Sequence, residues 1–106
     1  MNNKVFFKKH ADFCKFMGSS KRLEILSLLK DEELCVDDLA KKMGVPIANI
    51  SQHLAVMRDK GIVEVRRSGV KMFYKISDIR IVDVCSLMSK IMLDHLKKEL
   101  DSFSED

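Results

Sequence analysis

The sequence predicts a mainly α fold with one small β-hairpin (α+β), and three observations lead to this prediction. Apolar residues recur at helical spacing in five segments. Two of these segments are short, and Gly44 stands between them. The stretch over about 62–76 is basic and alternates apolar with charged residues around Ser68-Gly69, as two antiparallel strands do. A helix-turn-helix followed by such a hairpin is a winged helix-turn-helix, whose usual ligand is duplex DNA.

The first two helices follow from apolar spacing and from the break between them. The first is expected over about 4–17, where the spaced apolar residues are Phe6, Phe13, Phe16 and Met17. Gly18-Ser19-Ser20 ends this helix, and either serine can cap the next one. The second helix is expected over about 20–30, with an apolar face of Leu23, Leu26 and Leu29 and with Ile25 and Leu28 beside it. A polar turn over 31–33 follows it.

The helix-turn-helix is expected to pair a short helix with a recognition helix over about 47–60. The short helix carries an apolar face of Val36, Leu39, Ala40 and Met43. Pro46 is tolerated only around the first turn of the recognition helix, and Gly61 ends it. Helical spacing turns four residues inward, namely Ile47, Ile50, Leu54 and Met57. The exposed side then consists of Ala48, Asn49, Ser51, Gln52 and His53.

A last helix is expected over about 78–100, and its apolar stripe is wide for a small domain. The stripe includes Val84, Cys85, Met88, Ile91 and Met92. Such width predicts a face that is buried against another subunit. The polar tail 101–106 is expected to be frayed.

Composition and charge place limits on the function. The 106 residues fit a single domain, 1–106, and no run of about 18 apolar residues indicates a membrane span. Three cysteines suit a reducing cytoplasm. Residues 40–75 carry a net charge of +6, whereas the rest of the chain carries −3. An enzyme is not expected, because the sequence has no Gly-rich phosphate loop and no nucleophile with an evident base.

Polar and basic side chains supply the candidate contacts with double-stranded DNA. Five are candidates for base contacts: Ala48, Asn49, Ser51, Gln52 and His53. Five more are candidates for phosphate contacts, which position a protein without reading sequence: Lys42, Arg58, Arg66, Arg67 and Lys71. Two alternatives stay open. The basic region can be an ordinary solvated surface, and His53 can simply pack on its neighbours.

The chain resembles the ArsR/SmtB family of metal- and thiol-responsive bacterial repressors. The resemblance rests on five segments in order and spacing, namely 21–26, 33–40, 49–54, 61–63 and 66–74. It implies a homodimer through the first and last helices, with an interface of Phe13, Val84, Cys85, Met88, Ile91 and Met92. It also implies two recognition helices in successive major grooves of an imperfect palindrome. Ser19-Ser20 departs from the acidic or amide residue and proline of many members.

The resemblance also implies effector sites, and this sequence matches them only in part. Cys35 matches the first cysteine of a family motif, but Asp37 replaces the second. Cys14 could complete a site for a thiophilic metal or metalloid ion, with His10 one turn away. The alternative is that Cys14 and Cys35 are small buried hydrophobes.

Two other family sites fit less well. On the last helix Asp78 matches a zinc ligand, but Arg80 replaces a histidine, so zinc is not expected there. The cysteine pair of oxidant or persulfide sensors is missing, because Ser27 and Leu93 stand near its positions. Cys35 could instead pair with Cys85 or Cys14 if their Cα atoms lie within about 7 Å.

Three functions are therefore compared. The leading hypothesis is a repressor that a metal, metalloid or thiol-reactive effector releases from operator DNA. The alternative is a constitutive winged-helix DNA-binding module with purely structural cysteines. A protein-interaction module is the third, and the exposed cluster Ser51-Gln52-His53 argues against it.

Overall fold

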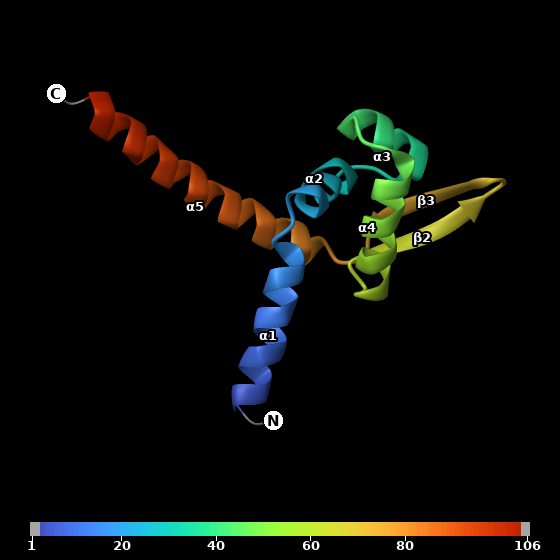
Figure 1. Cartoon of the computed structure of the whole chain (residues 1–106), viewed down its shortest axis with the longest axis horizontal. Helices are drawn as coiled ribbons and strands as arrows, with labels where there is room; N and C mark the ends of the chain where they lie inside the picture. The colour runs from blue at the N-terminus through green and yellow to red at the C-terminus, as the bar shows by residue number, and fades with distance from the viewer. Residues whose placement is uncertain (1–2, 105–106) are drawn as a thin grey trace.

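The computed structural model describes residues 3–104, which form five helices and a three-stranded antiparallel sheet (Figure 1). The helices are α1 (Asn3–Met17), α2 (Ser20–Leu29), α3 (Val36–Met43), α4 (Ile47–Asp59) and α5 (Ile79–Ser104). The strands are β1 (Leu34–Cys35), β2 (Val63–Ser68) and β3 (Lys71–Ile76). This is the predicted winged helix-turn-helix, in which α3 and α4 are the two short helices and β2 and β3 form the wing.

The hydrophobic core lies among α2, α3, α4 and the base of the sheet. Its largest fully buried side chains are Ile25, Leu39, Ile50, Leu54, Met57 and Ile62. Ser19 caps α2 as predicted, because its hydroxyl accepts a 3.4 Å hydrogen bond from the backbone N–H of Arg22. Leu26 and Leu29 are buried as predicted, together with Ile25 beside them, whereas Leu23 of the predicted face is 42% exposed.

The turn of the helix-turn-helix depends on one glycine. Gly44 ends α3 in the left-handed region at φ 66°, and its N–H bonds back to the carbonyls of Ala40 and Lys41. A residue with a Cβ is strained in this conformation, so glycine fits the position as predicted. Pro46 then precedes the first residue of α4 in an extended conformation. One further expectation was wrong: Ile47 is 51% exposed, because the buried face of α4 begins only at Ile50.

The wing is a hairpin with a two-residue loop. Val63 pairs with Ile76 at its base and Ser68 pairs with Lys71 at its tip, so Gly69 and Val70 form the loop. Gly69 has φ 62°, and a positive φ at the first loop residue alone is typical of a type II′ turn. The short strand β1 was not predicted. It pairs with β3, which gives the order β1-β3-β2.

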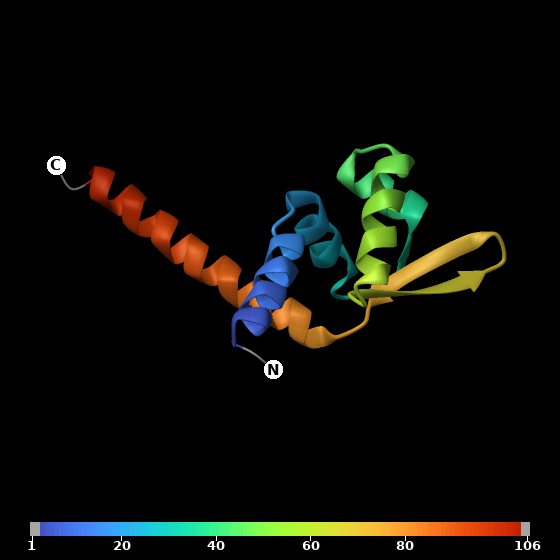
Figure 2. The same ribbon diagram turned by 60° about the horizontal axis from the view of Figure 1, so that its bottom comes forward.

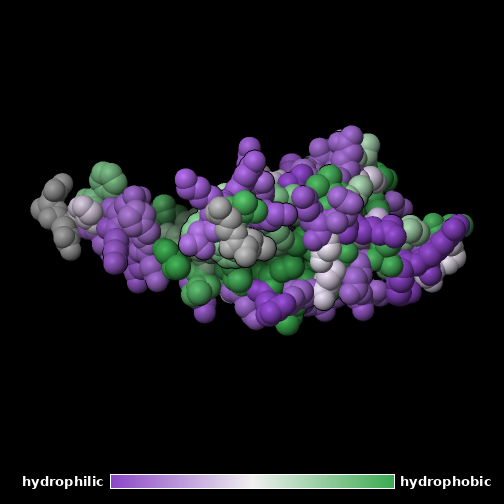
Figure 3. All heavy atoms as spheres, turned by 90° about the horizontal axis from the view of Figure 1, so that it is seen from below, coloured by the Kyte–Doolittle hydropathy of each residue, from purple (hydrophilic) through white to green (hydrophobic). Residues whose placement is uncertain are grey.

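Helices α1 and α5 extend away from this body in different directions (Figures 1 and 2). No residue of α5 is buried, and α1 buries only Phe16. The view from below shows hydrophobic side chains gathered in the middle of the molecule (Figure 3). The expected fraying of 101–106 was wrong up to Ser104, because Leu96, Leu100 and Phe103 continue the apolar spacing of the helix. Residues 105 and 106 lie outside the described part of the chain.

Among residues 3–104, none of the helices combines the length and the apolar character that crossing a bilayer requires.

Candidate nucleic-acid interface

The outer face of α4 presents short and polar side chains. Ala48, Ser51 and Gln52 are exposed, while Ile50, Leu54 and Met57 anchor the opposite face in the core. The packing therefore fixes the rotation of α4 about its own axis, and with it the direction in which Gln52 points. An exposed glutamine amide can both donate to and accept from a base edge, which is what pairing with adenine requires.

Asn49 and His53 lie one turn apart on α4, and both are half-buried rather than exposed as expected. The Oδ1 atom of Asn49 is buried without a hydrogen-bond partner among the described residues. Burial lowers the pKa of His53, and the charges of Arg22 and Lys21 lower it further. His53 is therefore neutral at pH 7, with one ring N–H to donate. This side of α4 borders the start of α2, which the helical spacing of α4 alone could not show.

Four of the five candidate phosphate contacts are exposed and carry no ion pair among the described residues. They are Lys42 on α3, Arg58 at the end of α4, and Arg67 and Lys71 on the wing. Arg67 uses only its Nε, which donates a 3.1 Å hydrogen bond to the carbonyl of Gly69. Its terminal guanidinium nitrogens have no hydrogen bond or ion pair among the described residues and can meet an anion.

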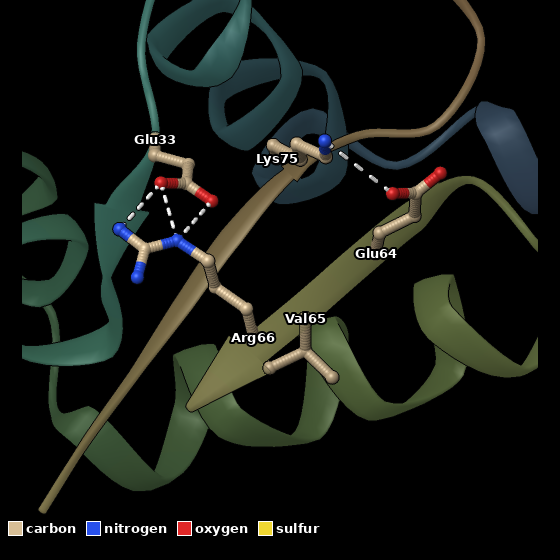
Figure 4. A pocket seen from close by; sticks show the side chains of 5 residues that line it. All are labelled: Glu33, Glu64, Val65, Arg66 and Lys75. Atoms are coloured by element: carbon tan, nitrogen blue, oxygen red, sulfur yellow. Dashed lines mark hydrogen bonds and ion pairs between the residues drawn. The ribbon is translucent and has the colours of Figure 1, made fainter. Parts of the chain in front are cut away.

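The fifth candidate, Arg66, is already engaged (Figure 4). Its Nε donates to both carboxylate oxygens of Glu33, at 2.8 and 2.9 Å, and its terminal nitrogen lies 2.8 Å from Oε1. Nearby, Lys75 and Glu64 form a looser ion pair at 3.6 Å. Glu33 was not predicted as a partner of the wing, because Glu33 and Arg66 are 33 positions apart in the sequence.

The three cysteines have different surroundings. Cys14 is exposed on α1, Cys35 is buried at the start of α3, and Cys85 is half-buried on α5. Burial raises the pKa of the Cys85 thiol, which makes it less reactive. The idea that Cys14 is a buried hydrophobe is therefore wrong for the single chain, whereas Cys35 fits it. Residues 3–104 contain no group of three His, Cys, Asp or Glu side chains that could hold a metal ion. The described part of a single chain therefore does not fit a metal site.

Asp78 is bound by a guanidinium at the start of α5. Arg80 donates to this carboxylate from its backbone N–H and from its side chain, with the shortest contact at 2.6 Å. These hydrogen bonds lower the pKa of Asp78 to about 2. The carboxylate that the family resemblance would give to zinc therefore already has a cationic partner within its own chain.

Residues 19–65, which span α2 to β2, match the family model described as bacterial regulatory protein, arsR family. The chain is also 31% identical over 93 residues to an uncharacterised HTH-type transcriptional regulator, Rv0081 of Mycobacterium tuberculosis, covering 87% of this chain and 82% of that protein. The chain belongs to the ArsR family.

Solved structures of ArsR-type regulators have the same fold. The crystal structure of Rv0081 superposes with a TM-score of 0.82 at 30% identity, covering 90% of this chain and 96% of that one. The homodimeric winged helix-turn-helix DNA-binding domain of Mb0332 from Mycobacterium bovis gives 0.77 at 26% identity, covering 91% of each chain. The transcriptional activator HlyU of Vibrio cholerae is 32% identical, covering 73% of this chain and 71% of HlyU.

Membership in the ArsR family establishes the class of function. The chain is a winged-helix transcriptional regulator that binds DNA, and the prediction that it is not an enzyme is confirmed. The family resemblance seen in the sequence is confirmed as well, since the matched residues 19–65 include the whole helix-turn-helix and the first half of wing strand β2.

Proposed function

We propose that this ArsR-family regulator is a homodimeric repressor that places its two α4 helices in successive major grooves of an imperfect palindrome. The observation that carries the proposal is the exposed face of α4, where Ser51 and Gln52 stand outward beside basic residues of α3 and the wing. Ala48, Asn49, Ser51, Gln52 and His53 would face bases. Lys42, Arg58, Arg67 and Lys71 would face phosphates. A cytoplasmic location belongs to the same proposal.

The dimer is proposed from the apolar faces that a single chain leaves in water. On α5, Val84, Met88, Ile91 and Met92 are each 54–63% exposed, and Phe13 of α1 is 46% exposed. Cys85 continues this face and is half-buried against the core. Covering apolar surface contributes about 25 cal/mol per Å², so a second copy that packs on these helices removes the main unfavourable exposure of the fold. The homodimeric state of the Mb0332 domain supports this arrangement.

Release from DNA is proposed to follow from an effector that acts on the thiols or through a metal or metalloid ion. A thiol-directed agent reaches Cys14 first, because Cys35 is buried in the single chain. A metal ion would need ligands from two chains, since residues 3–104 of one chain offer no cluster of three. By linkage, an effector that weakens DNA binding must itself be weakened by DNA to the same degree. The alternative is a constitutive DNA-binding module.

The test is a titration of reduced protein bound to a labelled palindromic duplex selected from random sequence, followed by fluorescence anisotropy. Arsenite, zinc, cadmium, an oxidant and a persulfide donor are added separately, to the native protein and to Cys14→Ser, Cys35→Ser and Cys85→Ser. Release by one agent that Cys14→Ser or Cys35→Ser abolishes supports the switch. Tight binding that no agent and no substitution changes supports the constitutive alternative. If the protein activates transcription when it binds its operator, as the name of the transcriptional activator HlyU indicates for that relative, the repressor assignment is overturned.

A further inference from the structure

The ion pair between Arg66 and Glu33 ties the two edges of the sheet together. Arg66 is on edge strand β2, and Glu33 immediately precedes the other edge strand, β1. The guanidinium therefore crosses the central strand β3 to reach the carboxylate (Figure 4). On the way it lies 4.9 Å from the ring centroid of Phe73, the residue that pairs directly with Arg66. The carboxylate and the aromatic ring thus hold the same cation.

Arg66 and Arg67 point to opposite faces of the wing, because successive side chains alternate along a strand. Val63, Val65 and Arg67 share one face, and Val65 on that face points toward α4 in the close view (Figure 4). Arg66 points the other way, toward Glu33. Arg67 therefore lies on the same side of the wing as the recognition helix, whereas Arg66 lies on the far side.

We infer that Arg66 is a positioning residue that fixes the wing against the segment leading into α3, and is not a phosphate contact. This inference rests on the proposed DNA-binding function and removes Arg66 from the phosphate contacts predicted from the sequence. A phosphate contact would require Arg66 to leave three contacts with Glu33, whose side chain is only 27% exposed. It would also have to come from the face that points away from α4. Holding β2 to β1 instead fixes the angle at which Arg67 and Lys71 reach past the recognition helix.

Glu33→Gln tests the inference, with Glu64→Gln as its matched control. Both substitutions remove one negative charge at or beside the sheet, but among residues 3–104 Glu64 pairs only with Lys75, at 3.6 Å. In hydrogen exchange without DNA, Glu33→Gln should raise the exchange rate of the wing amides by about fivefold. This is the change expected when local opening of the wing loses the stabilisation of one exposed, bidentate ion pair. Glu64→Gln should leave these rates unchanged. Equal rates in both variants would overturn the inference, whether or not the native protein binds DNA.

The sign of the effect on DNA binding separates the two roles of Arg66. If Arg66 were a phosphate contact held back by Glu33, Glu33→Gln would free it and tighten duplex binding more than Glu64→Gln does. A positioning role predicts the opposite, with Glu33→Gln binding about 5- to 30-fold more weakly than Glu64→Gln, because two wings of a dimer are affected.

Arg66→Gln and Arg67→Gln form a second matched pair with identical changes of charge. Arg67→Gln should reduce the slope of log K against log salt by about 1.8, the value for two phosphates. Arg66→Gln should weaken binding with less than half of that change in slope. The double exchange Glu33→Arg with Arg66→Glu should restore slow amide exchange. If the native protein binds no duplex, the proposed function fails. If it binds and Arg66→Gln lowers the slope as much as Arg67→Gln does, only the positioning role fails.

Discussion

The salt dependence of DNA binding is a direct consequence of which basic side chains are available. Four candidate phosphate contacts per chain are exposed and without an ion pair among the described residues: Lys42, Arg58, Arg67 and Lys71. A dimer would then neutralise eight phosphates, which gives a slope of about −7 for log K against log salt. Between 50 and 200 mM salt the affinity should fall by about 10⁴-fold. Substituting Arg67 removes two of the eight contacts, so the slope should become about −5 and the fall about 10³-fold.

The assay is fluorescence anisotropy of a labelled duplex at several salt concentrations, for native protein, Arg67→Gln and Lys98→Gln. Lys98 is an exposed basic residue near the end of α5. Its substitution changes the net charge by the same amount as that of Arg67 but leaves the wing intact. Lys98→Gln should keep the native slope. If Arg67→Gln also keeps the native slope, the wing does not reach the phosphates, and the reasoning that places it there is refuted.

Three further predictions concern the scaffold and the recognition helix. Leu54→Ala should lower the free energy of unfolding by about 2–5 kcal/mol in urea titrations, because Leu54 is fully buried and anchors α4; a loss below about 1 kcal/mol would contradict this packing. Gly44→Ala should lower the free energy of unfolding by about 1 kcal/mol in the same assay. The loss comes from backbone strain alone, since nothing lies within 4 Å of the added Cβ. An unchanged stability would argue against the left-handed turn. The pKa of His53 is lowered, so it is neutral at pH 7, and the negative potential of bound DNA would favour its charged form. Duplex binding should therefore tighten as the pH falls from 7 to 5.5, and His53→Gln, but not His95→Gln on α5, should remove part of this dependence; equal profiles for both variants would place His53 away from the DNA.

The helices and the wing could be predicted from sequence because their signals are local. Each signal involves only positions that are close in the sequence. These signals are the helical spacing of apolar residues, the glycine Gly44 in the turn, and the alternation of apolar and charged residues around Gly69. Strand β1 has two residues and is defined by its pairing with Tyr74 and Phe73, about 40 positions away. No periodic pattern exists within two residues, so only the folded chain could reveal this strand.

The sequence predicted which residues belong to the candidate site, but not which of them are half-buried or held in an ion pair. Spacing identified the outward residues of α4, yet Asn49 and His53 are half-buried because α2 lies beside that side of the helix. In the sequence, Arg66 and Arg67 are adjacent arginines, and nothing distinguishes them as candidates for phosphate contacts. They differ in the structure because the strand turns them to opposite faces and because Glu33 lies near only one of them.

The central claim is that the exposed face of α4 reads bases, and the ratio of specific to non-specific affinity tests it most directly. The native protein and Gln52→Ala are each titrated with the selected duplex and with a scrambled duplex of equal length at one salt concentration. We predict a native ratio of about 10³ or more. Gln52→Ala should lower it by at least about 30-fold, because a base contact of about 1–3 kcal/mol is lost in each of the two half-sites, with scrambled-duplex affinity and thermal stability unchanged. A native ratio near one, or a ratio that Gln52→Ala leaves unchanged while the protein stays folded, would contradict the account.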